Sequence, residues 1–297
     1  MSFEQRNDIT TLKEELSRHG YVADNSLAAT LLLAKGLERP VLLEGEAGVG
    51  KTDVAKAMAL ARDTRLIRLQ CYEGLDAHST LYEWNYQRQL LAIKLLEDDE
   101  RSASEKEKDI FSETYLLKRP LLEAISAEPA AVLLIDEIDR ADEAFEAYLL
   151  ELLSDYQVSI PELGTIQARS RPLVILTSNG TRELSDALRR RCLYHYVDYP
   201  DYAKELTIVQ ARVPDAPTAL ARQVVEFVQS LRGLDLRKKP GIAETLDWTS
   251  ALLQLNISTL DEDGTERIME TLSALIKTQE DCARLTAPVL KKMVAAC

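Results

Sequence analysis

Val41-Leu42-Leu43-Glu44-Gly45-Glu46-Ala47-Gly48-Val49-Gly50-Lys51-Thr52 is the most informative stretch of this 297-residue chain. Its leading apolar residues predict the end of a buried strand, and residues 53–61 predict a helix. Between them, Gly45 to Thr52 match the pattern G-x-x-x-x-G-K-[ST], in which main-chain amides surround a phosphate group. The following helix directs its positive end at the same anion. The stretch therefore predicts a phosphate-binding loop between a strand and a helix.

The residue types in this loop indicate a nucleoside triphosphate with Mg²⁺. In this pattern the lysine, Lys51, reaches the β and γ phosphates, and the hydroxyl of Thr52 ligates Mg²⁺. A glycine-rich turn without a ligand is the alternative, and the flanking strand and helix argue against it. The predicted binding residues are Gly45, Glu46, Ala47, Gly48, Val49, Gly50, Lys51 and Thr52.

The overall composition fits a globular protein, with 46% hydrophobic residues. The net charge of −13 disfavours a broad nucleic-acid surface, although basic residues cluster at 189–191 and 237–239. Four cysteines without a C-x-x-C pair predict reduced thiols. The N-terminus lacks the apolar core of a signal peptide, and no apolar run is long enough to cross a bilayer. These features predict a soluble, cytoplasmic protein, with peripheral docking at a membrane left open.

The order of predicted elements divides the chain into two parts. Apolar strand-like runs alternate with helices up to about residue 200, and only helices follow. We therefore expect an α/β nucleotide-binding domain over residues 1–200, with a parallel sheet flanked by helices. A smaller all-helical domain is expected over residues 201–297. Within the first domain we expect an insert over about 72–128 and a β-hairpin over about 157–167.

Several local predictions depend on the spacing of apolar residues. The run 97–109 is rich in charge and predicts a solvated loop or helix face. Gly36 is expected to stop a helix that begins at Ser26. Gly20 to Val22 is a candidate for main-chain contacts to a nucleotide base, with core packing of Tyr21 as the alternative. Three longer stretches are predicted as helices: 82–96, 265–278 and 281–296.

A second predicted strand ends in two carboxylates. Residues 130–135 form the continuous apolar run expected of a central parallel strand, and Asp136 and Glu137 follow. Ligands of open α/β sheets bind at the carboxyl ends of such strands. We therefore expect Asp136 to hold Mg²⁺, directly or through water, and Glu137 to orient the water that attacks the γ-phosphate. If the strand continues, the two side chains face opposite ways. Taken alone, an acidic turn is the alternative.

Further along the chain, an amide and three arginines extend this set. Asn179 follows the predicted strand 173–176, where its amide can fix the attacking water or contact the γ-phosphate, or serve only as a turn residue. The adjacent Arg189, Arg190 and Arg191 suit the stabilisation of charge on a transferring phosphoryl group. Their distance from the loop in sequence is compatible with service to a neighbouring subunit's nucleotide. A basic surface patch is the alternative.

These elements together resemble the layout of the AAA+ ATPases: P-loop, Asp-Glu strand, sensor asparagine, arginine finger and helical lid. More narrowly, the chain resembles the MoxR family, whose pre-sensor hairpin is similar to residues 157–167 and whose extended Asp-Glu motif is similar to residues 136–141. Three segments are similar to the branch associated with carbon monoxide dehydrogenase maturation, the CoxD-like proteins: 81–90, 160–166 and 239–248. The resemblance covers nearly the whole chain except residues 97–109.

The resemblance implies a role for each matched position. It makes Glu137 the catalytic base, Asn179 the first sensor, and Arg191 the arginine finger that acts in trans, with Arg190 as the alternative. It also implies that Lys51 and Thr52 bind phosphate and Mg²⁺ and that Asp136 supports Mg²⁺. Where many relatives carry a second-sensor arginine early in a lid helix, this chain reads Gly241-Ile242-Ala243-Glu244-Thr245, with Lys238 or Lys239 as candidate substitutes.

The function implied by this resemblance is that of an ATP-hydrolysing chaperone in a homo-oligomeric ring, expected to be a hexamer. Its implied client is a molybdenum hydroxylase, such as carbon monoxide dehydrogenase, that awaits metal or sulfur insertion. A von Willebrand factor A-domain protein is the implied partner. The alternative is a nucleic-acid motor or clamp-loader-like ATPase, which the acidic charge and a hairpin tip without basic residues disfavour. A scaffold that binds ATP without hydrolysing it is a third reading, which Glu137, Asn179 and Arg191 disfavour.

Overall fold

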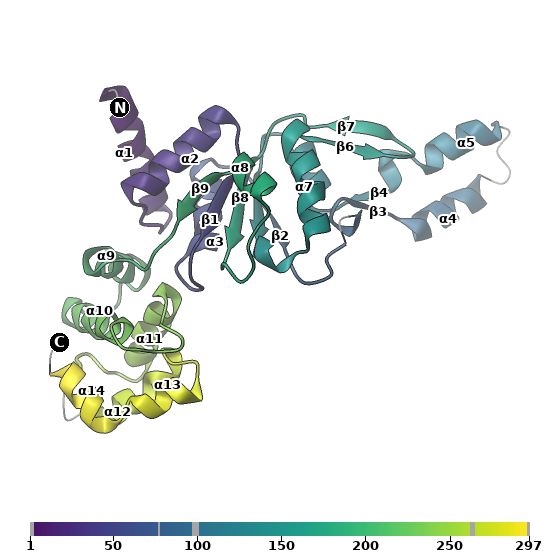
Figure 1. Cartoon of the computed structure of the whole chain (residues 1–297). Coiled ribbons are helices and arrows are strands. Elements are labelled where there is room, and N and C mark those ends of the chain that lie inside the picture. Colours follow the sequence, from purple (N-terminus) through teal and green to yellow (C-terminus); the bar gives the residue numbers. More distant parts are fainter. Residues whose placement is uncertain (1–2, 77, 97–100, 262–264, 296–297) are drawn as a thin grey trace. The chain divides into compact units, whose positions relative to one another are not determined.

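The computed structural model describes residues 3–76, 78–96, 101–261 and 265–295 (Figure 1). The chain forms two compact units, each made of separate chain segments. The sheet unit comprises residues 26–44 and 58–195, and the lid unit comprises residues 1–25, 45–57 and 196–297. The phosphate-binding loop therefore belongs to the same unit as the C-terminal helices. The domain boundary near residue 200 stays a prediction.

The sheet has five strands in the order β2-β5-β8-β1-β9. Neighbours β2 and β5, β5 and β8, and β8 and β1 pair in parallel. Every residue of strands β5 and β8 is buried, as expected for strands covered on both faces. The α/β fold with a parallel sheet is thereby confirmed. The strands are β1 (Val41–Glu44), β2 (Leu66–Gln70), β5 (Val132–Asp136), β8 (Leu173–Ser178) and β9 (Leu193–Tyr196).

Helices of the sheet unit cover this sheet. Leu121 and Ile125 of one helix and Phe145 and Leu149 of another are buried in one core with Leu133 of β5. The helix predicted to stop at Gly36 runs on to residue 37 and is followed by Glu38 with φ 52°. The helices are α2 (Asn25–Leu37), α3 (Lys51–Ala61), which crosses between the units, α6 (Pro120–Ser126), α7 (Glu143–Asp155) and α8 (Asp186–Arg191).

The stretch 82–96 is not one helix, so that prediction was wrong. Its first residues form β3 (Tyr82–Trp84), which pairs antiparallel with β4 (Leu116–Lys118), and only α4 (Tyr86–Leu95) is helical. Aromatic side chains favour strands when cross-strand neighbours are available. Here Trp84 is buried against Phe111, with ring centroids 5.3 Å apart. A non-local pairing therefore overrides the helical spacing.

The charged run is an exposed helix over most of its described length. Helix α5 (Ala103–Ile110) has no buried residue, as the solvated reading predicts. Ser102 and Glu105 form a capping box at its start, with the Ser102 amide donating to the Glu105 carboxylate over 2.9 Å. Residues 97–100 of the run lie outside the described residues. In Figure 1, α4 and α5 extend from the sheet unit as a pair of helices.

The predicted hairpin is confirmed. Strands β6 (Gln157–Ile160) and β7 (Gly164–Gln167) pair antiparallel, with Ser159 opposite Thr165. Val158 and Ile160 on one face are buried in the core of the sheet unit, beside α7. Pro161 and Glu162 at the tip are exposed. The hairpin is thus anchored on one side and open to solvent at its tip.

The lid unit is helical. Phe227 and Trp248 lie at the centre of its core, with ring centroids 4.9 Å apart. The helix predicted over 265–278 ends at Thr271 and passes into a short 3₁₀ turn. The helix predicted over 281–296 is two helices, because a new one begins at Ala287 with Pro288 in its first turn. Ala296 lies outside the described residues. The helices are α1 (Phe3–Arg18), α9 (Tyr202–Arg212), α10 (Thr218–Arg232), α11 (Ile242–Gln254), α12 (Thr265–Thr271), α13 (Gln279–Arg284) and α14 (Ala287–Val294).

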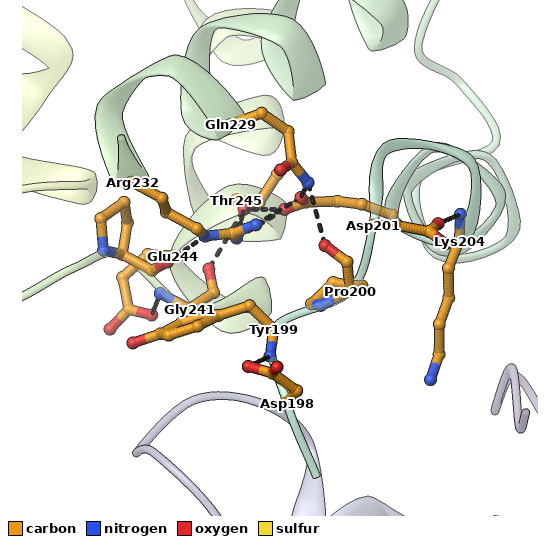
Figure 2. A network of polar contacts seen from close by, with 12 residues as sticks. Asp198, Tyr199, Pro200, Asp201, Lys204, Gln229, Arg232, Gly241, Glu244 and Thr245 are labelled. Atoms are coloured by element: carbon orange, nitrogen blue, oxygen red, sulfur yellow. Dashed lines mark hydrogen bonds and ion pairs between the residues drawn. The ribbon is translucent and has the colours of Figure 1, made fainter. Parts of the chain in front are cut away.

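A buried ion pair joins two of these helices (Figure 2). Arg232 of α10 donates to both carboxylate oxygens of Glu205 of α9, at 2.6 and 2.7 Å, and the two side chains are 6% and 0% exposed. The Thr245 hydroxyl and the Gln229 amide also donate to this carboxylate, at 2.7 and 2.6 Å. The guanidinium lies 5.0 Å above the Tyr199 ring. The pair is fully satisfied, as a buried charge requires.

Replacement of Arg232 by Met is expected to lower the free energy of unfolding of the lid unit by about 3–5 kcal/mol, because the Glu205 carboxylate stays buried without its cation. Urea unfolding followed by circular dichroism measures this loss. The control is Arg237→Met in the same unit. Arg237 forms an ion pair with Glu280, and each of the two side chains is 69% exposed. Equal midpoints for the two variants would show that the buried pair contributes no more than a surface pair.

The described residues contain no helix that is both long and apolar enough to span a membrane.

Candidate nucleotide site

The phosphate-binding loop lies in the lid unit, and its own lysine is hydrogen-bonded to main-chain carbonyl oxygens of the loop. The Nζ of Lys51 donates to the carbonyl oxygens of Gly45 and Glu46, each over 2.7 Å. Gly48 and Gly50 have φ angles of 81° and 93°, which L-residues with a side chain rarely adopt. A Cβ on Gly45 would lie 2.2 Å from the Val197 carbonyl oxygen. The glycines are therefore required by conformation and by space.

The loop passes directly into α3, which begins at Lys51 itself. Thr52 is thus in the first helical turn, where the orientation of the main-chain amides and the helix dipole favour an anion. The site offers an ammonium group, a hydroxyl and main-chain amides in one short segment. This donor set fits the phosphates of a nucleotide, and the hydroxyl oxygen of Thr52 is a ligand that Mg²⁺ accepts.

Beside the loop, the lid unit contains a small pocket. The predicted segment Gly20 to Val22 lines it, together with Val49 and Gly50 of the loop. Burial raises the pKa of Tyr21 well above its ordinary value, so its hydroxyl stays neutral. The remaining lining residues are Asp53, Asp198, Pro200, Lys204, Ile208, Arg212, Ile242 and Leu246.

Asp136 ends β5 in the sheet unit and is held from two sides. The Thr177 hydroxyl of β8 donates to its Oδ1 over 2.5 Å, in a buried contact. Arg68 of β2 donates to its Oδ2 from Nη2 at 2.5 Å and from Nε at 3.1 Å. The carboxylate is 3% exposed. Three neighbouring strands thus position this side chain, as the parallel register predicts.

Glu137 does not continue the strand, so the condition under which the two side chains would face opposite ways is not met. It has φ 55° and ψ 51°, the left-handed region, and a short 3₁₀ helix follows it. Its amide donates to the Thr177 hydroxyl over 2.9 Å. Thr177 therefore contacts both acidic residues. The sequence patterns did not predict this role of Thr177. The available signal was the pair of hydroxyl residues, Thr177 and Ser178, that ends an otherwise apolar strand. The Glu137 side chain is 36% exposed, 3.7 Å from Arg140.

The loop that carries Asn179 is anchored by Asp139. The main-chain amide of Asn179 donates to Asp139 Oδ2 over 3.2 Å, and the main-chain amide and hydroxyl of Thr181 donate to the same oxygen at 2.9 and 2.6 Å. Burial raises the pKa of Asp139, but these hydrogen bonds outweigh it and leave the pKa below its ordinary value. The carboxylate therefore stays ionised and fixes the main chain at the predicted sensor. Sequence reasoning had given Asp139 no role of its own.

The three adjacent arginines have different surroundings. Arg189 lies 3.4 Å from Glu44 and stacks over the Tyr194 ring at 5.4 Å. The guanidinium of Arg191 donates to the Leu150 carbonyl and the Ser154 hydroxyl of α7. Arg190 is 83% exposed and lies 3.9 Å from Asp186. The Arg190 side chain is thus more exposed than that of Arg189, which is 36% exposed.

Residues 40–192 match the family described as AAA domain (dynein-related subfamily), which is half of the chain. A relative in Staphylococcus haemolyticus, an uncharacterised protein, is 28% identical over 229 residues, 74% of this chain and 78% of its own. The gas vesicle ATPase GvpN of Haloferax mediterranei is 28% identical over 207 residues, 65% of this chain. This chain spans 56% of that ATPase's length.

Among solved structures, a putative ATPase from Cytophaga hutchinsonii is 17% identical with a TM-score of 0.49, covering 99% of this chain and 94% of its own. The Thermotoga maritima RuvB Holliday junction branch migration motor is 18% identical with a TM-score of 0.43, covering 89% of this chain and 68% of its own. The order of strand, phosphate-binding loop and paired carboxylates along the chain agrees with the family match. The chain belongs to the AAA domain family, dynein-related subfamily, and is an ATP-binding ATPase.

Proposed function

We propose that this ATPase is a remodelling chaperone of the MoxR type, in the CoxD-like branch, that works as a homo-oligomeric ring, expected to be a hexamer. The observation that carries the proposal is the β6–β7 hairpin. It lies between the strand that ends at Asp136 and the strand that ends at Ser178. One face is buried on the core and the tip is exposed. A segment connected to both strand ends is suited to transmit changes at the nucleotide to a bound protein.

The proposed hydrolysis uses Mg²⁺ held by Thr52 and Asp136. Bound there, the metal would neutralise charge on the phosphate oxygens. Arg68 and Thr177 orient the Asp136 carboxylate for this role. Glu137 serves as the base for the attacking water, and Asn179 fixes that water or contacts the γ-phosphate. Gly20 to Val22 contact the base in the pocket beside the loop.

We further propose that a guanidinium from α8 completes the site of the neighbouring subunit. The resemblance favours Arg191, but its guanidinium is engaged by α7 of its own chain. Arg190 is exposed, and its ion pair with Asp186, which is also exposed, is long, at 3.9 Å, so that pair is weak. The surroundings therefore support Arg190, the alternative, as the residue that acts in trans.

The client we propose is a molybdenum hydroxylase, such as carbon monoxide dehydrogenase, that awaits metal or sulfur insertion in the cytoplasm. A von Willebrand factor A-domain protein is the proposed partner. Both proposals rest on the similarity of residues 81–90, 160–166 and 239–248 to the CoxD-like branch. The hairpin tip offers proline, an acid and leucine, with no basic residue for a phosphate backbone.

The test of this function is the ATPase rate with different added macromolecules. A molybdenum hydroxylase purified without its active-site metal and sulfur is expected to raise the rate severalfold, because client binding on the hairpin biases the ATP-bound state. The mature hydroxylase and duplex DNA are the controls and are expected to have no effect. Stimulation by DNA alone, lost as salt is raised, would instead support the nucleic-acid motor. Equal rates with immature and mature hydroxylase would refute the client.

A further inference from the structure

Within the lid unit, the start of α11 is bound to the phosphate loop through main-chain groups. The amides of Ile242 and Ala243 donate to the Gly48 carbonyl oxygen, at 2.9 and 3.3 Å. These are the first two residues of α11, whose amides have no partner within the helix. The loop carbonyl therefore takes the place of a capping side chain.

Gly241 is required here by space and not by conformation. Its φ of −84° and ψ of −175° suit any residue. A Cβ at this position would lie 2.8 Å from both the carbonyl carbon and the oxygen of Gly48, and 2.9 Å from its Cα. All three are backbone atoms, which cannot move aside as a flexible side chain does. The two glycines are in direct backbone contact.

Buried side chains hold the segment before α11 in position (Figure 2). Arg232, fixed by Glu205, donates from Nε to the Pro240 carbonyl over 2.7 Å. The Thr245 hydroxyl, which also donates to Glu205, lies 3.1 Å from the Gly241 carbonyl. The Glu244 carboxylate accepts from the Gly241 amide over 3.0 Å. The ion pair therefore sets the position of Gly241 as well as stabilising the unit.

A second carboxylate fixes the other end of the same segment. Asp281 of α13 accepts from the amides of Arg237 and Lys238, at 2.8 and 3.1 Å. The side chains of Lys238 and Lys239, the candidate substitutes for a second sensor, are exposed. The segment 237–241 is thus anchored at both ends. It contacts the phosphate-binding loop through main-chain atoms.

We propose that α11 orients a phosphate-binding amide of the loop, so that Gly241 is a positioning residue for ATP. A trans peptide is planar, with its carbonyl and amide pointing in opposite directions. Since the Gly48 carbonyl is bound to α11, the Val49 amide on the same peptide points away from α11. In this loop pattern such amides bind the phosphates. The lid unit therefore sets nucleotide affinity through its main chain.

The test is Gly241→Ala, with Gly36→Ala as the matched control. A Cβ on Gly36 meets no atom within 4 Å, and Gly36 lies in the helix α2. Gly241→Ala separates α11 from Gly48 and removes two hydrogen bonds, so the Kd for ATP and for ADP is expected to rise about tenfold. Gly36→Ala should bind both as the wild type does. Thermal unfolding without nucleotide shows whether each variant is folded. Equal Kd values for the two variants would overturn the proposal.

A measurement on the unaltered protein does not depend on how the variant folds. Hydrogen exchange of the Ile242 and Ala243 amides is expected to slow when ADP binds, since an ordered loop keeps the Gly48 carbonyl in place. Amides in the middle of α11, such as that of Thr249, should exchange at the same rate with and without ADP. Unchanged exchange at Ile242 and Ala243 would show that α11 does not respond to the loop and would overturn the proposal.

Discussion

Replacement of Glu137 by Gln is expected to slow ATP hydrolysis by about 10²- to 10⁴-fold, while ATP still binds. Gln has nearly the same size as Glu, and the main-chain amide of residue 137 still donates to the Thr177 hydroxyl. The Gln side chain cannot accept the proton of the attacking water. The left-handed main chain at Glu137 is set by its neighbours and does not require the carboxylate. The loss should therefore appear in kcat, with the Kd for ATP nearly unchanged.

Phosphate release measures the rate, and a fluorescent ATP analogue measures binding. Lys51→Ala is the comparison variant, because it removes the ammonium that reaches the phosphates and is expected to abolish ATP binding. It also removes the two hydrogen bonds that close the loop. A Glu137→Gln protein that hydrolyses ATP at the normal rate would contradict the role of Glu137 as the base.

Replacement of Arg190 by Ala is expected to lower the ATPase rate of the assembled ring by about 10³-fold or more, the usual contribution of an arginine finger. Arg191→Ala should retain most activity, because its guanidinium binds the Leu150 carbonyl and Ser154 within its own chain. Steady-state rates at ring-forming concentrations compare the two variants. A larger loss for Arg191→Ala would return the finger to the position that the family resemblance favours.

Mixing two inactive variants tests action in trans. Arg190→Ala subunits are expected to bind ATP normally. Lys51→Ala subunits are expected to bind no ATP but supply an intact Arg190. Mixed rings are expected to regain part of the wild-type rate, because some sites combine a functional loop with a neighbour's arginine. If activity stays absent in the mixture while both variants assemble, the arginine acts within its own subunit or the protein does not work as a ring.

Most elements that carry the nucleotide could be predicted from the sequence. The strand, loop and helix around Lys51 and the apolar run before Asp136 are continuous segments, so their patterns are visible along the chain. The strand at Tyr82–Trp84 could not be predicted in this way. Its partner, Leu116–Lys118, is distant in sequence, and the pairing between the two segments sets the local structure.

Local patterns of glycine, charge and apolar spacing were enough to identify a P-loop ATPase with an Asp-Glu strand, an insertion hairpin and a helical C-terminal part. How the functional groups are held became visible only in the folded chain. Thr177 joins two acidic residues, α7 engages Arg191, and Gly241 meets Gly48 from the far end of the sequence. Such contacts between distant segments depend on which side chains and carbonyls face one another after folding, and local spacing does not encode that.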